Sequence, residues 1–274
     1  MRFIDAHTHA QFAAFGDGSK EVIDRALENG IWLINVGTQQ DTSRLAVEIA
    51  KRYPEGVYAT VGLHPIHTAK SFHDAQELGD TADAKGFTSR GEEFDYDYYK
   101  KLAQDPKVVA IGECGLDYAA FARERSERLQ KRAPAEAFSE GGLSPDEVHQ
   151  RKEKQKQAFI RQIELAAEVK KPLMIHCRSG APERASPQNE AGRNAFTDLI
   201  DILSSFHSSL SSMPSPGVIH FFTGTAEDAK KLLAMGFYFT FGGAITFPPR
   251  LAARSRGEAG APNYEEIIKI LPLN

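Results

Sequence analysis

Short apolar runs alternate with amphipathic stretches along most of the chain. The apolar runs are rich in Val, Ile and Phe and only a few residues long, which is typical of strands buried in a parallel sheet. The stretches between them carry apolar residues three and four positions apart, which predicts helices that bury one face. The predicted strands are Phe3–His7, Ile31–Val36, Val57–Leu63, Val108–Gly112, Pro172–Ile175, Gly217–Phe221 and Phe237–Phe241.

Capping residues mark the ends of the predicted helices. Gly30 and Gly236 stand where a glycine ends a helix in the left-handed conformation, and Thr225 stands where a hydroxyl caps the first turn. An Asp-Thr-Ser sequence gives a similar start signal at residue 41. Helices are therefore expected over residues 20–30, 41–53, 154–171 and 225–236.

Strand–helix alternation predicts an α/β fold with a parallel sheet. Seven such units in 274 residues suit a TIM-type (β/α) barrel better than an open doubly wound sheet, since no G-x-G-x-x-G follows the first strand. We expect residues 1–274 to form a single domain. Segments near 70–95, 119–150 and 179–192 each follow a predicted strand and are expected to be loop insertions on the C-terminal face of the barrel, the second of which also holds a helix.

Polar side chains gather where the predicted strands end. In the sequence FIDAHTHA, His7 and His9 are two positions apart, so both imidazoles point to one side of a strand. Such a pair arises easily by chance, but four further strands also finish in a histidine or a carboxylate. In a barrel these strand ends share one rim, where the following residues would converge: His7, His9, His64, Glu113, His176 and His220.

This group of side chains predicts a metal centre. Imidazoles with few carboxylates and no thiolate cluster favour Zn²⁺, Mn²⁺ or Ni²⁺. Glu113 offers two oxygens and can bridge two ions about 3.5–4 Å apart. Such a pair activates water at neutral pH and binds phosphodiester oxygens, so the predicted reaction is hydrolysis.

Composition indicates where the protein acts but does not identify its substrate. The net charge of −4 gives no general attraction to nucleic acid, and no apolar run approaches the length of a membrane span. Cys114 and Cys177 are the only cysteines, and both alternate away from the proposed site, so we expect them to be buried in a protein of the reducing cytoplasm. We also assign Phe221, Phe222 and Phe247 to the core.

The motifs FIDAHTH, VGLHP, AIGECGLDY, MIHCR, VIHFFTGT and GFYFTFGGAITF together resemble the TatD family of metal-dependent deoxyribonucleases, amidohydrolase-like enzymes on a TIM barrel. The six motifs occur in order across essentially the whole chain. The resemblance implies a hydrolase that cleaves DNA, often from the 3′ end, with two divalent ions whose identity (Zn, Mn, Mg or Ni) stays open.

The resemblance also implies a role for each matching residue. His7 and His9 would hold one ion, Glu113 would bridge, and His176 and His220 would hold the second. His64 would line the site and contact the substrate phosphate or its water, so Glu113 and His64 are the candidate catalytic residues. The substrate pocket would be shaped by Asp117, Tyr118 and Arg178.

The chain departs from the family at one motif. The family's last strand carries Glu-Thr-Asp-x-Pro, whose Asp is a metal ligand, and no Glu-Thr-Asp occurs in these 274 residues. We therefore expect the last strand and helix of the barrel to be missing, either because the chain is a fragment or because it is a shortened homologue.

Two other functions stay open. One is a related barrel hydrolase of a small amide, lactone or ester, although such enzymes commonly use a carboxylated lysine where this chain has Glu113. The other is a catalytically weakened protein that binds DNA without cutting it. Single-stranded DNA or 3′ ends are the expected partner, with no membrane, and a monomer is the working expectation for the oligomeric state.

Overall fold

The computed structural model describes residues 3–69, 72–73, 87–88, 91–119, 121, 144–179, 194–246 and 264–272. The three loop insertions predicted from the sequence lie largely outside these residues. The chain forms two compact units. The first comprises Met1–Cys114 and Ala158–Met174, and the second comprises Gly115–Gln157 and Ile175–Asn274.

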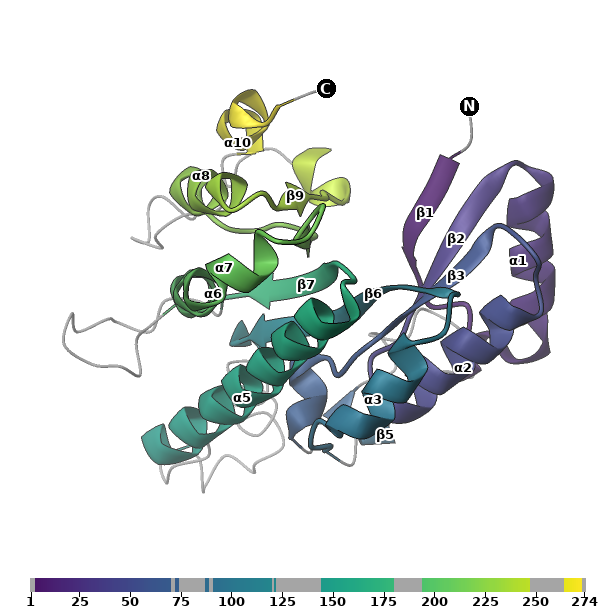
Figure 1. Cartoon of the computed structure of the whole chain (residues 1–274), viewed down its shortest axis with the longest axis horizontal. Coiled ribbons are helices and arrows are strands. Elements are labelled where there is room, and N and C mark those ends of the chain that lie inside the picture. The colour runs from purple at the N-terminus through teal and green to yellow at the C-terminus, as the bar shows by residue number, and fades with distance from the viewer. Residues whose placement is uncertain are drawn as a thin grey trace, which may run out of the picture. The chain divides into compact units, whose positions relative to one another are not determined.

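The first unit contains a parallel sheet covered by helices. Its strands run in the order β1 (Phe3–Thr8), β2 (Ile31–Val36), β3 (Val57–Val61) and β6 (Val108–Asp117, of which Val108–Cys114 belongs here). Figure 1 shows β1, β2 and β3 side by side, with α1 (Ser19–Glu28) and α2 (Gln40–Lys51) along them. Further elements are 3₁₀ helices at Ala13–Gly18 and Pro65–Thr68, α3 (Tyr96–Ala103), and a small antiparallel pair of β4 (Phe72–His73) and β5 (Phe87–Thr88).

Apolar side chains of the strands and helices fill the core of the first unit. The long helix α5 (Pro145–Val169) contributes its C-terminal half, with Phe159 and Ile163 fully buried, as the apolar stripe at residues 154–171 predicts. Burying one such side chain stabilises the fold by roughly 1.5–3 kcal/mol. The other fully buried side chains include Ile23, Val36, Ala46, Val61, Tyr99 and Ile111.

The second unit repeats the strand–helix plan. It holds the end of β6, β7 from Ile175 (strand Leu173–Arg178), β8 (Gly217–His220) and β9 (Tyr238–Phe239), in that order. Its helices are α6 (Ala195–Ser205), α7 (His207–Leu210), α8 (Ala226–Ala234) and α10 (Tyr264–Ile270), with a 3₁₀ helix at Gly243–Thr246. Phe196 and Phe222 pack edge to face in its core, 5.3 Å apart.

The predicted strands and caps agree with the structure at most points. Strand β2 has the predicted bounds, Thr225 caps α8 by accepting a hydrogen bond from the Asp228 N–H, and Gly30 and Gly236 follow their helices with positive φ. Helix α2 begins at Gln40 rather than at the Asp-Thr-Ser signal, because the Thr42 hydroxyl accepts a hydrogen bond from the Gln39 N–H and so belongs to the first turn.

Strand β6 is longer than predicted and places Glu113 within the strand. Its backbone stays hydrogen-bonded beyond Gly112, since the Glu113 N–H donates to the carbonyl of Gly37 at 3.0 Å. Gly112 has φ +151°, and a Cβ there would lie 2.4 Å from the Met174 carbonyl oxygen. A glycine is therefore needed at this position because two strand backbones approach closely. In the sequence pattern the same glycine looks like the end of a strand.

Of the three phenylalanines assigned to the core, only Phe222 is confirmed there. The assignment of Phe221 was wrong: the side chain is 47% exposed, because a positive φ of 51° turns the chain away from β8 at this residue. Phe247 lies outside the described residues. Both cysteines are free and buried, as expected.

Within the described part of the chain, none of the helices combines the length and the apolar character that crossing a bilayer requires.

Candidate metal centre

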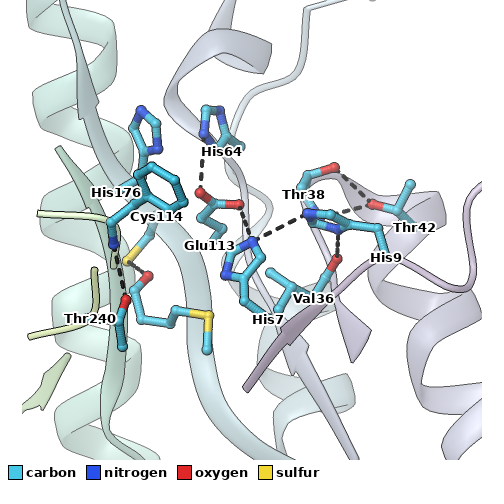
Figure 2. A network of polar contacts seen from close by, with 12 residues as sticks. His7, His9, Val36, Thr38, Thr42, His64, Glu113, Cys114, His176 and Thr240 are labelled. Carbon is cyan, nitrogen blue, oxygen red and sulfur yellow. Dashed lines mark hydrogen bonds and ion pairs between the residues drawn. The ribbon is translucent and has the colours of Figure 1, made fainter. Parts of the chain in front are cut away.

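The end of β1 brings His7 and His9 together in the first unit. Their Nε2 atoms lie 3.2 Å apart, as period-two alternation predicts for a His-x-His pair. Glu113 on β6 reaches the same point, with Oε2 3.3 Å from Nε2 of His7. Figure 2 shows the three side chains pointing toward one another, with Glu113 between His7 and His64.

The backbone of β2 fixes the protonation of His9. Nδ1 of His9 lies 2.9 Å from the carbonyl oxygen of Val36, and because a carbonyl only accepts, Nδ1 carries the proton. The same carbonyl also accepts a hydrogen bond from Nε2 of Gln11 at 2.6 Å. In the neutral ring this leaves the lone pair on Nε2, directed toward His7.

Burial keeps His9 neutral. Loss of hydration and the neighbouring His7 together lower the pKa of His9 from 6.5 to about 4, although the negative charge of Glu113 and the bond to Val36 oppose the shift. At neutral pH the imidazole is therefore unprotonated at Nε2, which is the form that binds a metal ion.

His64 presents the opposite nitrogen. It follows β3, is 6% exposed, and its Nδ1 accepts a hydrogen bond from the Ile66 N–H at 3.2 Å. In the neutral ring Nε2 then carries the proton, and this atom lies 3.5 Å from Oε1 of Glu113. His64 thus offers a hydrogen-bond donor beside Glu113, whereas His9 offers a lone pair.

The donor atoms of His7, His9 and Glu113 fit a transition-metal ion. They lie within 4.8 Å of one another. Two ligands of a tetrahedral ion at 2.0–2.1 Å are separated by about 3.3 Å, close to the observed 3.2 and 3.3 Å spacings. A metal-bound histidine typically donates its other N–H to a carbonyl, as His9 does to Val36.

The remaining predicted site residues belong to the second unit. Nε2 of His176 on β7 lies 3.0 Å from Oδ2 of Asp117, which is buried at the end of β6. Tyr118 is also buried, and its hydroxyl donates to Asp198 at 2.6 Å, while Lys156 pairs with the same carboxylate oxygen at 3.0 Å. Arg178 is exposed at the end of β7, and His220 is half-buried at the end of β8.

Several residues that support these side chains were not predicted. Gln11, Gln155, Gln162 and Asp198 are polar yet almost fully buried, and each hydrogen-bonds to a backbone or side chain next to the site residues. The only signal in the sequence is that Gln155 and Gln162 interrupt the apolar face of the strongest helix.

Acid should destabilise the metal-free protein through His9. Its pKa of about 4 in the folded state lies below 6.5, so between these values the unfolded state binds more protons. The contribution to stability, up to about 3 kcal/mol, is complete above about pH 6.5 and is lost as the pH falls toward 4. Urea unfolding at pH 7 and pH 5 should show this loss in wild type and in His207→Gln, an exposed control, and a reduced loss in His9→Gln. Equal pH dependence in all three proteins would contradict it.

Comparisons with known proteins agree with the motifs. The family model described as TatD related DNase matches residues 4–262. The uncharacterized metal-dependent hydrolase YabD of Bacillus subtilis is 30% identical over 98% of this chain and 75% of its own length. The 3′-5′ ssDNA/RNA exonuclease TatD is 30% identical in Edwardsiella piscicida, over 87% of this chain, and 31% identical in Erwinia billingiae, over 84%. The chain spans 65% and 62% of the lengths of these two exonucleases.

Solved structures show the same fold. YjjV, a TatD homologue from Escherichia coli K12, superposes with a TM-score of 0.59 at 22% identity, covering 99% of this chain and 76% of that one. A TatD family hydrolase from Entamoeba histolytica gives 0.53 at 23% identity, covering 88% and 65%. These similarities confirm the α/β fold of the TIM-barrel class that the strand–helix alternation predicts.

Proposed function

Because the chain belongs to the family of TatD-related DNases, we propose that it is a metal-dependent hydrolase that cleaves phosphodiester bonds in single-stranded DNA from the 3′ end. The relatives named as 3′-5′ ssDNA/RNA exonucleases support this substrate class. The observation that carries the proposal is the arrangement around neutral His9. Its Nδ1–H donates to the carbonyl of Val36, and its Nε2 lone pair points toward Nε2 of His7, which lies beside the buried carboxylate of Glu113.

We assign two divalent ions to the site. His7 and His9 would hold one, His176 and His220 would hold the other, and Glu113 would bridge them, with Zn, Mn, Mg and Ni as the candidate metals. When bound, such ions lower the pKa of water and neutralise phosphate charge. The first three residues are supported by their mutual distances, and the two histidines of the second unit by their positions within β7 and at the end of β8.

The surrounding side chains have distinct tasks in this proposal. His64 donates from Nε2 to a non-bridging phosphate oxygen or to the attacking water. Asp117 holds the ring of His176 by the 3.0 Å contact. Arg178 is exposed, and its planar guanidinium suits a phosphate of the incoming strand. Tyr118 shapes the wall of the pocket from its buried position beside Asp198.

Glu113 favours this function over hydrolysis of a small amide, lactone or ester. Its carboxylate stands where barrel amidases commonly place a carboxylated lysine. The second alternative is a weakened homologue that binds DNA without cutting it. Two free, buried cysteines suit the reducing cytoplasm, and we take the protein to act there as a monomer.

A nuclease assay separates these three functions. We expect 5′-labelled single-stranded DNA to shorten stepwise from its 3′ end with Mn²⁺ or Mg²⁺, and the reaction to stop with excess chelator. A 3′-phosphorothioate end should slow the first cut. Binding of the labelled strand without shortening would favour the DNA-binding homologue, and turnover of carboxylic esters or amides alone would contradict phosphodiester hydrolysis.

A further inference from the structure

Two buried glutamines on α5 hold the strand ends that carry site residues. Gln155 and Gln162 are seven residues apart, which is two helical turns, and therefore share a face of α5. They are 2% and 1% exposed. A buried primary amide must find partners for both its N–H and its carbonyl groups, and each glutamine pairs its oxygen and its nitrogen with the N–H and the carbonyl of one backbone residue. Nε2 of Gln162 also donates to the carbonyl of Ala158 at 3.2 Å.

Gln162 binds both polar backbone groups of Leu63. Its Oε1 accepts from the Leu63 N–H at 2.9 Å, and its Nε2 donates to the Leu63 carbonyl at 3.1 Å. Gly62 makes this approach possible, since a Cβ there would lie 2.8 Å from Oε1 of Gln162. Leu63 lies beyond the end of β3. The glutamine side chain therefore takes the place of a neighbouring strand as the hydrogen-bond partner of the Leu63 backbone.

The residue that follows Leu63 is His64. Its own N–H donates to the carbonyl of Thr38 at 2.9 Å, so the backbone of residues 63–64 is held from two sides. The imidazole then stands with Nε2 3.5 Å from Glu113. Gln162 thus fixes the segment from which His64 projects.

Gln155 makes the same pair of bonds in the second unit. Its Oε1 accepts from the Asp117 N–H at 2.9 Å, and its Nε2 donates to the Asp117 carbonyl at 3.1 Å. The side chain of Asp117 is the one that contacts Nε2 of His176. Gln155 therefore fixes the backbone of the residue that orients His176.

We propose that Gln155 and Gln162 are positioning residues, which set His176 through Asp117 and His64 through Leu63. The proposal rests on the function assigned above, in which His64 contacts the phosphate and His176 binds a metal ion. Glutamine suits the task because its amide matches a peptide group in both donor and acceptor, whereas glutamate lacks the donor and methionine lacks both.

Gln162→Met and Gln155→Met test the proposal. Methionine is close to glutamine in volume, so the packing is kept while both hydrogen bonds are lost. Gln157→Met is the matched control, because Gln157 is exposed on the same helix. Ile163→Val is a second control that weakens the core next to Gln162 and leaves both hydrogen bonds between Gln162 and Leu63 available. If a methionine variant does not fold, the corresponding leucine variant, which also removes both hydrogen bonds and buries no charge, replaces it.

The first readout needs no activity. Long-range ¹H–¹⁵N spectra of the metal-free protein, with imidazoles assigned by His64→Asn and His176→Asn, should show a shifted or split His64 signal in Gln162→Met and a shifted or split His176 signal in Gln155→Met. The His207 signal should not change in either. Unchanged His64 and His176 signals in folded variants would overturn the proposal whether or not the protein is a nuclease.

The second readout is kinetic. With single-stranded DNA and Mn²⁺, Gln162→Met should lower kcat/KM about 10-fold, mainly through KM, whereas loss of folded protein in Ile163→Val lowers the apparent kcat alone. Equal kinetic effects of the two variants at matched thermal midpoints would contradict a positioning role. If wild type cuts no nucleic acid, the proposed function fails, and the imidazole spectra still decide the roles of the glutamines.

Discussion

Glu113→Gln is expected to lower kcat on single-stranded DNA about 10³-fold while leaving the protein folded. The substitution keeps the volume and one oxygen, but removes the negative charge that the structure places 3.3 Å from Nε2 of His7 and 3.5 Å from Nε2 of His64. A bridging carboxylate neutralises two ions at once, and metal-ion stabilisation of a transition state amounts to several kcal/mol. The loss should therefore appear in kcat rather than in KM.

The fold should tolerate this change. Glu113 is 5% exposed, so its neutral replacement no longer buries a charge in the metal-free protein, and the thermal midpoint should fall little or rise. Glu227→Gln, at an exposed position in the first turn of α8, serves as the control for handling and charge. Turnover within a factor of ten of wild type in folded Glu113→Gln would rule out the bridging role.

Divalent metal should raise the thermal midpoint of the wild-type protein by about 5–10 °C. Saturation at 100 times the dissociation constant stabilises a folded protein by about 2.7 kcal/mol, and each kcal/mol corresponds to about 2–4 °C for a chain of this size. The neutral Nε2 of His9 and its neighbour His7 supply two of the ligands in our assignment, so His7→Ala combined with His9→Ala should remove most of this shift.

The control for the double variant is His207→Ala, which removes an exposed imidazole on α7. Its midpoint should rise with Mn²⁺ or Zn²⁺ as much as that of wild type. Scanning calorimetry after chelator treatment, with and without added metal, measures all three proteins. A metal-induced rise of full wild-type size in the double variant would contradict the assignment of His7 and His9 as ligands.

The period-two rule was enough to predict that His7 and His9 share one side of a strand, because alternation is a property of any extended chain. The apolar runs likewise predicted most strands and the parallel connection between them. Glu113 was placed on the same rim as His7 because it also follows a predicted strand, and the carboxyl ends of parallel barrel strands share one face. The structure brings these three residues together.

The histidine tautomers, the end of β6 and the role of Gln162 could not be predicted, because each depends on a contact that the sequence pattern does not show. The tautomers of His9 and His64 differ because one Nδ1 faces a carbonyl and the other faces an N–H. The end of β6 was misplaced because Gly112 resembles a strand terminator, although it lies against the backbone of Met174. Gln162 binds a residue 99 positions away, and in the sequence it is one polar residue in a helix.

An anomalous difference map of a crystal soaked in Mn²⁺ tests the metal centre most directly. Our assignment predicts a peak within about 2.3 Å of both Nε2 atoms of His7 and His9 and of a carboxylate oxygen of Glu113, and its disappearance in the His7→Ala/His9→Ala protein. A soaked crystal with no peak at these three atoms, or with a peak at this same position that survives the double substitution, would contradict the metal centre and the hydrolase mechanism built on it.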